Sequence, residues 1–163
     1  MPIQFAAQSD SVGTPQTVTT SYKTQMSGVA QTATLRRGRV IELKMGPLSD
    51  PSSTDCNILY AIQRQTAAGT GGSTVTPNFA ETWEAGTAPS AGSLWGANYT
   101  AEGTYGTRIW SMFMNQHSGM IWYSPDDIGL PWPAVNNNGL AFMTKGSSAS
   151  YSGTSGWDVK FTE

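Results

Sequence analysis

Three runs in this chain alternate large apolar residues with other side chains, and each run has an arginine at one end. The runs are Arg39-Ile41-Leu43-Met45, Ile58-Tyr60-Ile62-Arg64 and Arg108-Trp110-Met112-Met114. Because alternate residues of a β-strand share one face, each run predicts a strand with an apolar face that ends in a guanidinium group. If the three strands lie antiparallel in sequence order, all three arginines gather at one end of the structure.

The rest of the chain also consists of short apolar runs between turns rich in Gly, Pro, Asn and Ser. No window of ordinary helix length shows a 3.6-residue period. Many short strands joined by such turns predict an all-β, single-domain β-sandwich that is jelly-roll-like. The expected strands cover residues 35–45, 56–65, 107–115, 119–124, 139–145 and 156–162.

The N-terminal stretch fits this pattern less well. Residues 1–34 are rich in Gln, Thr and Ser and poor in large apolar side chains. This composition predicts an extended N-terminal arm or an edge strand, with a floppy terminus as the alternative. Such an arm could add a strand to a neighbouring subunit. The β-sandwich domain is then expected to cover residues 35–163.

A second stretch, residues 67–106, predicts a long loop region, because small residues dominate it and aromatic residues are spread among them. A segment this long inside a compact domain is expected to hide short strands, near residues 73–76 and 99–102. Its aromatic side chains need a surface to pack on. That surface is either the rim of the same domain or a neighbouring subunit.

The composition limits the classes of partner. The chain has 163 residues, of which 12% are charged, and a net charge of −2. These values argue against a general nucleic-acid or membrane-surface binder. Cys56 is the only cysteine, which excludes an intrachain disulfide framework and fits a reducing cytoplasm. The first residues show no signal peptide, so we expect a protein that is made in the cytoplasm and is not secreted through a signal-dependent route.

A search for catalytic or cofactor-binding residues finds no convincing set. His117 is the only histidine, and it lies in a predicted turn where an exposed side chain is expected. Paired carboxylates for glycoside hydrolysis could be chosen from Glu81, Glu84 and Glu102, but any chain with eleven acidic residues allows such a choice. The sequence has no Gly-rich phosphate loop and no spaced set of metal ligands. We therefore expect no catalysis, cofactor or metal.

The one basic cluster is Leu35-Arg36-Arg37-Gly38-Arg39. Strict alternation places Arg37 and Arg39 on the face of the apolar residues that follow. Either Gly38 carries a bulge that shifts the register, or both arginines project from the end of the apolar face. Their guanidinium groups then pair with a carboxylate of the chain such as Glu163, contact a subunit or another partner, or bind nucleic acid.

Several short blocks follow one another in order along residues 35–163. They are Leu35 to Glu42 with Gly46, Ile58 to Ile62, Arg64 to Thr70 with Thr76-Pro77, Asn115-Gln116, Trp122, Asn138 to Leu140, and Gly153-Thr154 leading to Glu163. Their order and spacing resemble the decoration, or cement, proteins of tailed-bacteriophage heads. The resemblance implies a jelly roll that binds the outside of an assembled capsid, often as a trimer, and that carries no catalytic residues.

On this resemblance we expect a virion structural protein on the capsid exterior, synthesised in the host cytoplasm. Its expected partners are the major capsid protein and further copies of itself in a homotrimer, with no nucleic acid or membrane.

The alternatives are a tail or neck component, or a carbohydrate-binding β-sandwich module, virion-borne or free. A glycan site predicts two or three coplanar exposed rings, whereas a decoration protein buries its rings in the core or between subunits. The expected interface residues are Arg36, Arg37, Arg39, Arg64, Arg108, Trp83, Trp95 and Tyr99.

Overall fold

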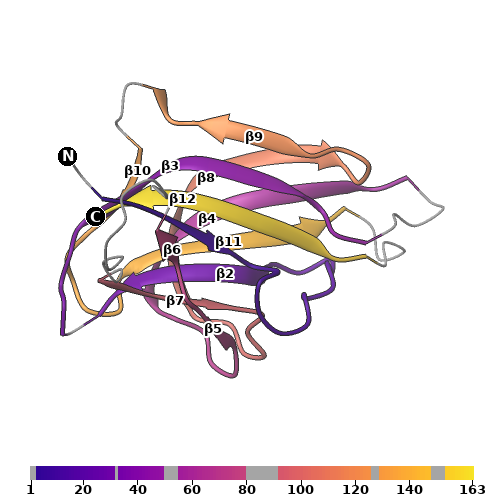
Figure 1. The fold of residues 1–163 in the computed structure, drawn as a ribbon. Helices are drawn as coiled ribbons and strands as arrows, with labels where there is room; N and C mark the ends of the chain where they lie inside the picture. The colour runs from indigo at the N-terminus through magenta and orange to yellow at the C-terminus, as the bar shows by residue number, and fades with distance from the viewer. Residues whose placement is uncertain (1–2, 32, 50–54, 80–91, 126–128, 148–152) are drawn as a thin grey trace.

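In the computed structural model the chain is a sandwich of two antiparallel β-sheets, as the sequence predicts (Figure 1). The structure describes residues 3–31, 33–49, 55–79, 92–125, 129–147 and 153–163. Within these ranges no helix is long and apolar enough to cross a membrane. Their strands are β1 (Gln4–Gln8), β2 (Lys23–Ala30), β3 (Gly38–Pro47), β4 (Asn57–Ala67), β5 (Ser73–Val75), β6 (Asn78–Phe79), β7 (Ser93–Ala97), β8 (Thr104–Asn115), β9 (Met120–Tyr123), β10 (Leu130–Trp132), β11 (Gly139–Gly146) and β12 (Ser155–Thr162). The jelly-roll connectivity stays a prediction.

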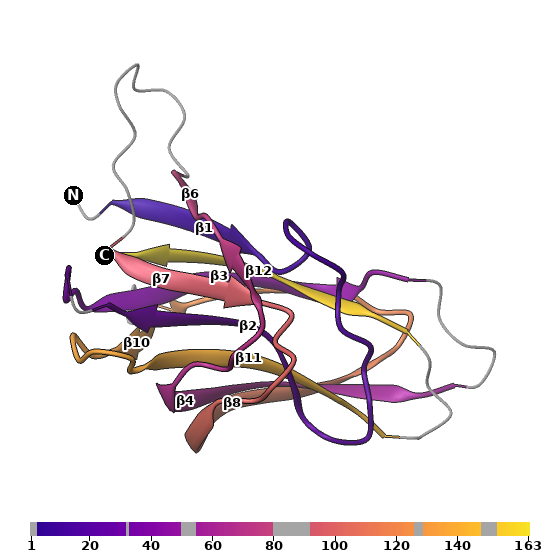
Figure 2. The ribbon, with the colours of Figure 1, turned by 90° about the horizontal axis from the view of Figure 1, so that it is seen from below.

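The two sheets lie face to face, and a hydrophobic core fills the space between them (Figure 2). One sheet, which we call the β3 sheet, has the strand order β10-β3-β12-β1-β6, and β9 also pairs with β3. The other, which we call the β4 sheet, has the order β5-β7-β2-β11-β4-β8. All of these strand pairs are antiparallel. Strands from the two ends of the chain therefore lie side by side, as β1 and β12 do.

The prediction of an N-terminal arm over residues 1–34 is wrong for the described part of that stretch. β1 lies between β12 and β6, and β2 lies between β7 and β11, so both are interior strands. The composition was misleading because β2 turns small residues toward the core. A Cβ on Gly28 would lie 2.6 Å from the indole of Trp95, so in a close-packed interior the large ring requires a small residue opposite it.

The six strands expected from the sequence are all present, but the alternation along β3 changes at one residue. They correspond to β3, β4, β8, β9, β11 and β12. On β3, the extra residue Ile41 interrupts the pairing with β12, so Val40 rather than Ile41 is fully buried. A bulge at Gly38 was one of two alternatives for this run; the strand does contain a bulge, but it lies at Ile41. On β4 the alternate apolar residues are fully buried, as predicted, and these are Ile58, Tyr60 and Ile62.

The region expected to be a long loop contains β5, β6 and β7. β5 confirms the strand expected near residues 73–76. Residues 99–102 form no strand and contribute only an isolated bridge between Ala101 and Thr70. β7, which pairs along β2, was not predicted. Its sequence, Ser-Leu-Trp-Gly-Ala, mixes small and large residues and carries no clear alternation.

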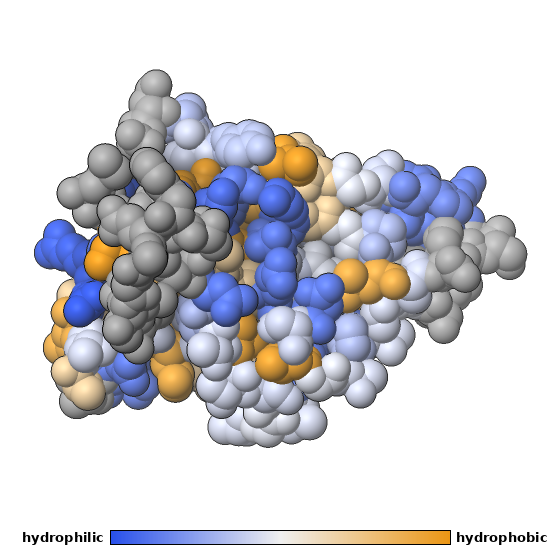
Figure 3. All heavy atoms as spheres, viewed as in Figure 1, coloured by the Kyte–Doolittle hydropathy of each residue, from blue (hydrophilic) through white to orange (hydrophobic). Residues whose placement is uncertain are grey.

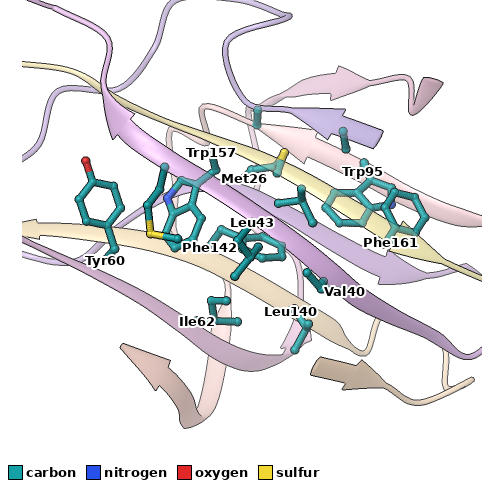
Figure 4. Close-up of a cluster of buried hydrophobic side chains, with 14 of the residues drawn as sticks. Met26, Val40, Leu43, Tyr60, Ile62, Trp95, Leu140, Phe142, Trp157 and Phe161 are labelled. Atoms are coloured by element: carbon teal, nitrogen blue, oxygen red, sulfur yellow. The ribbon is translucent and has the colours of Figure 1, made fainter. Parts of the chain in front are cut away.

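Aromatic rings from both sheets fill the core (Figure 4). Trp95 of β7 stacks on Phe161 of β12 at 4.6 Å between ring centroids and on Phe142 of β11 at 5.9 Å. Trp132 of β10 meets Trp95 edge-on at 6.1 Å. Farther along the sandwich, Trp157 packs on Phe142 at 5.4 Å. All five rings are at most 2% exposed, so they join the two layers through a dry aromatic contact.

The outward face of the β3 sheet carries a short ladder of charges. Glu42 lies between two lysines, with Nζ–O distances of 3.1 Å to both Lys44 and Lys160. Lys44 also lies 3.9 Å from Asp158. Burial alone would raise the pKa of the Glu42 carboxyl, but hydrogen bonds and charges from both lysines hold that pKa below its ordinary value. Figure 3 shows hydrophilic side chains running across the face on which β1, β12 and β3 lie.

Candidate functional site

Three arginines meet at one end of the sandwich, where the start of β3 lies near the last residues of β4. Arg37 and Arg39 flank Gly38 at the start of β3. Arg64 of β4 stands opposite the buried Leu140 of β11, on the side of the strand that faces the core. Together they line an open hollow of about 570 Å³, which we call the arginine hollow. Its lining consists of Arg37, Gly38, Arg39, Arg64, Pro131, Trp132, Pro133, Thr162 and Glu163.

The predicted gathering of arginines is confirmed for Arg39 and Arg64, which come from different sheets, and is wrong for Arg108. β8 carries one extra residue, Ile109, in its pairing with β4. This bulge turns Arg108 to the outward face of the β4 sheet, away from the hollow. There its Nη1 donates a hydrogen bond of 2.7 Å to the hydroxyl of Tyr22.

Trp132 and its two proline neighbours form the apolar wall of the hollow. A Cβ on Gly38 would overlap the indole of Trp132, so glycine allows β3 to lie against β10 at this point. Arg64 Nη1 donates to the carbonyl of Pro131 at 3.3 Å, a contact that joins the two sheets across the hollow. Sequence reasoning did not single out Trp132. The available signal was the Pro131-Trp132-Pro133 run, since prolines restrict a strand to a sheet edge.

Glu163 lines the arginine hollow, and its carboxylate also binds the backbone at the start of β7. Its oxygens accept hydrogen bonds from the backbone N–H groups of Gly92 at 2.5 Å and Ser93 at 2.9 Å, and so hold the start of β7. Among the described residues, no ion pair joins Arg37 to a carboxylate. Arg36 packs its aliphatic stem beside Gly92, where an added Cβ would lie 2.7 Å from the arginine Cδ. Among the described residues that line the hollow, three arginines therefore accompany a single carboxylate, which already accepts the two backbone hydrogen bonds.

The aromatic residues expected at an interface lie inside the domain. Trp95 is 1% exposed within the core and Tyr99 is 7% exposed. The Tyr99 hydroxyl lies 2.7 Å from Oγ of Ser27, and burial raises the pKa of Tyr99. Because buried rings cannot touch a partner, the interface prediction is wrong for both. Both rings pack within their own domain, and Trp95 does so in the core rather than on the expected rim. Trp83 lies outside the described residues.

Two aromatic rings are strongly exposed among the residues that the structure describes, Phe113 at 70% and Tyr123 at 63%. Phe113 stands opposite Leu59 on the outward face of the β4 sheet. Tyr123 stands opposite Glu42 on the outward face of the β3 sheet. The two rings therefore point in opposite directions and do not form the coplanar pair that a glycan platform requires.

Two of the ionisable residues considered for catalysis, His117 and Glu102, lie in the described part of the chain. The His117 side chain is 55% exposed in a turn, as expected. Glu102 accepts a hydrogen bond of 2.6 Å from the Tyr105 hydroxyl, and burial together with this bond raises the pKa of Tyr105 to about 12. The described residues hold no group of three or more His, Cys, Asp or Glu side chains that could bind a metal. Glu81 and Glu84 lie outside the described residues.

Comparison with models of protein families, with curated proteins and with solved structures finds no match to this chain. The resemblance to decoration proteins therefore rests on the sequence blocks alone.

Proposed function

We propose that the protein is a virion structural protein that binds the outer surface of an assembled phage capsid and stabilises it, without catalysis. The arginine hollow carries this proposal. Arg37, Arg39 and Arg64 present guanidinium groups in one open, apolar-walled depression, and such groups bind carboxylates in a bidentate geometry. The hollow therefore suits an acidic segment of the major capsid protein.

The way the arginines are held also supports a docking role. Arg39 and Arg64 belong to strands rather than to loops, and the aromatic core joins the two sheets beneath them. A contact surface on rigid strands loses little conformational entropy when it binds. Many copies bound to a symmetric shell then turn modest individual contacts into strong overall attachment.

The glycan-binding alternative finds less support. Stacking on a sugar needs neighbouring exposed rings, and the two strongly exposed rings of the described chain, Phe113 and Tyr123, lie on opposite sheets. The buried tryptophans stabilise the core instead.

Co-sedimentation with purified heads of the phage that encodes the protein tests the proposal. We expect the wild-type protein to sediment with heads, and Arg64→Glu to weaken binding at least tenfold because it reverses a charge in the hollow. Arg108→Glu is the matched control, since it makes the same charge change on an exposed strand residue that faces away from the hollow. Binding should also weaken as the salt concentration rises. The proposal would be contradicted if the wild-type protein did not sediment with heads, or if Arg64→Glu and Arg108→Glu weakened head binding equally.

A further inference from the structure

β8 is the last strand in the order of the β4 sheet, with β4 on one side of it. Among the described residues no strand pairs with its other side. At 12 residues it is long, whereas the strands that end the two sheets on the opposite side of the sandwich, β5 and β6, have 3 and 2 residues. The open edge of β8 is therefore the longest unpaired strand edge in the described structure.

The hydrogen-bond pattern shows which backbone groups point to this open edge. Just beyond β8, Gln116 N–H donates to the carbonyl of Cys56 at 3.0 Å, so Gln116 directs its backbone groups toward the neighbouring chain segment. In an antiparallel ladder this direction alternates along the strand. Met112 then directs its N–H and C=O toward β4, whereas Ser111 and Phe113 direct theirs toward the open edge.

The side chains along this stretch leave the edge unprotected. Residues 109–115 read Ile-Trp-Ser-Met-Phe-Met-Asn, with no charge and no proline. Phe113 is 70% exposed and Met112 is 37% exposed. Natural edge strands are usually shortened, charged or bulged, because a regular apolar edge is a template for another strand. The irregular pairings of β8 with β4 fall after Ile62, which leaves residues 110–115 regular.

We propose that a second copy of this chain pairs with β8 along this edge, antiparallel and about a two-fold axis that passes beside Met112. An uncharged strand can face its own copy without like-charge repulsion, and antiparallel pairing of identical edges is self-complementary. In this register Ser111 of each copy exchanges backbone hydrogen bonds with Phe113 of the other. The small Ser111 leaves room for the exposed ring, and the two Met112 side chains meet on the other face.

This inference does not depend on capsid binding, because it uses a strand edge that contains none of the arginines of the hollow. Pairing about a two-fold axis gives a dimer rather than the trimer that the family resemblance implies. The molar mass of the free protein therefore separates the two arrangements.

The first experiment is light scattering coupled to size-exclusion chromatography, from about 1 to 200 μM protein, a range that covers micromolar affinities. We expect a mass that rises toward twice the 17.4 kDa of the chain. Phe113→Lys should raise the dissociation constant at least tenfold, because each copy then places a lysine on the shared edge. Ile121→Lys is the matched control, since Ile121 is 53% exposed but lies on β9, and it should associate like wild type.

The second experiment tests the register. Residues directly opposite each other in a non-hydrogen-bonded antiparallel pair have Cβ atoms about 4.5–5.5 Å apart, close to the span of a disulfide. Met112→Cys should therefore form a covalent dimer on mild oxidation. Tyr123→Cys should not, and the native Cys56 is only 4% exposed.

Several results would overturn the pairing: a monomeric or trimeric wild type throughout the range, unchanged association of Phe113→Lys, or no cross-link through position 112. If the wild type is monomeric and Phe113→Lys no longer binds heads, the dimer is excluded and the β8 edge is instead a contact with the capsid. A monomeric Phe113→Lys that still sediments with heads would support the dimer and leave capsid binding as a separate surface.

Discussion

The two faces of the β3–β12 strand pair show how differently this protein uses packing and charge. The inward face places Leu43 and Phe161 in the dry core, both fully buried. The outward face of the same strands carries the Glu42, Lys44 and Lys160 ladder, in which the two lysine side chains are 46% and 35% exposed. Neighbouring residues on one backbone therefore meet a close-packed interior on one side and water on the other.

The magnitudes expected for the two faces differ several-fold. A large aromatic side chain removes about 150–250 Å² from water, and buried apolar area stabilises by about 25 cal/mol per Å². A solvent-exposed ion pair contributes only about 0–1 kcal/mol, because water and salt screen it. We therefore expect the core to dominate the free energy of unfolding and the ladder to adjust it.

The largest effect should come from Trp95, whose ring touches both sheets. Trp95→Ala removes the stack on Phe161 at 4.6 Å and leaves a cavity, which should lower the free energy of unfolding by about 3–5 kcal/mol. Leu94→Ala is the matched control, since Leu94 precedes it on β7 and is 50% exposed; its loss should stay near 0.5 kcal/mol. Urea unfolding followed by tryptophan fluorescence and circular dichroism measures both. Similar losses would mean that the core does not dominate.

A smaller loss should follow from adding a single methyl group beneath the same ring. Gly28→Ala places a Cβ 2.6 Å from the Trp95 indole, and the overpacking should cost about 1–3 kcal/mol. Gly106→Ala is the control, because the nearest atom to its Cβ would lie 3.8 Å away. In the double variant Gly28→Ala/Trp95→Leu the losses should be less than additive, since the smaller side chain makes room. Additive losses in urea unfolding would show that the ring and the glycine are independent.

The predictable part of the fold is the part in which large residues alternate along one strand. In β12 the residues Trp157, Val159 and Phe161 are buried, whereas Lys160 lies on the outward face. Here the alternation of apolar and polar residues is enough to predict which face of the strand points to the core. β2 could not be found in this way. Its inward Gly28 is required by Trp95, a residue distant in sequence, and a small residue gives no local signal of burial.

The candidate site also has a part that alternation within one strand predicts and a part that depends on contacts between strands. Arg39 and Arg64 come together as the sequence predicts. Arg64 lies at the end of the apolar face of β4, whereas Arg39 follows the buried Gly38 and precedes the buried Val40, so it lies on the other face of β3. Arg108 does not join them, because the bulge at Ile109 turns it to the opposite face. A bulge depends on pairing with another strand, so alternation within one strand cannot locate it. The wall formed by Trp132 depends in the same way on the contact between β10 and β3.

On the outward face, Glu42→Gln should produce a modest loss. It keeps the shape of the side chain but removes both 3.1 Å ion pairs, so that only the 3.9 Å contact between Lys44 and Asp158 remains of the ladder. We expect the free energy of unfolding to fall by about 0.5–1 kcal/mol, less in high salt. Asp158→Asn is the control, since its contact with Lys44 is longer at 3.9 Å. Chemical unfolding at low and at high salt measures both, and a loss as large as that of Trp95→Ala would reverse the ranking of the two faces.

The smallest effect should be the pH dependence of that same loss. The pKa of Glu42 in the folded protein lies below its ordinary value of 4.5, because Lys44 and Lys160 outweigh the effect of burial. A carboxyl whose pKa falls on folding stabilises the protein fully above its unfolded pKa and loses this contribution as the pH falls through the folded pKa. The other titratable groups beside the ladder, the Asp158 carboxyl and the Tyr123 hydroxyl, are present in both wild type and Glu42→Gln. The difference in unfolding free energy between the two proteins should therefore be constant from pH 7 to about pH 5.5 and shrink as the pH falls below 4.5 toward the lowered folded pKa. A difference that does not shrink at all between about pH 5.5 and pH 3 would mean that Glu42 acts through its shape and neutral hydrogen bonds rather than through its charge.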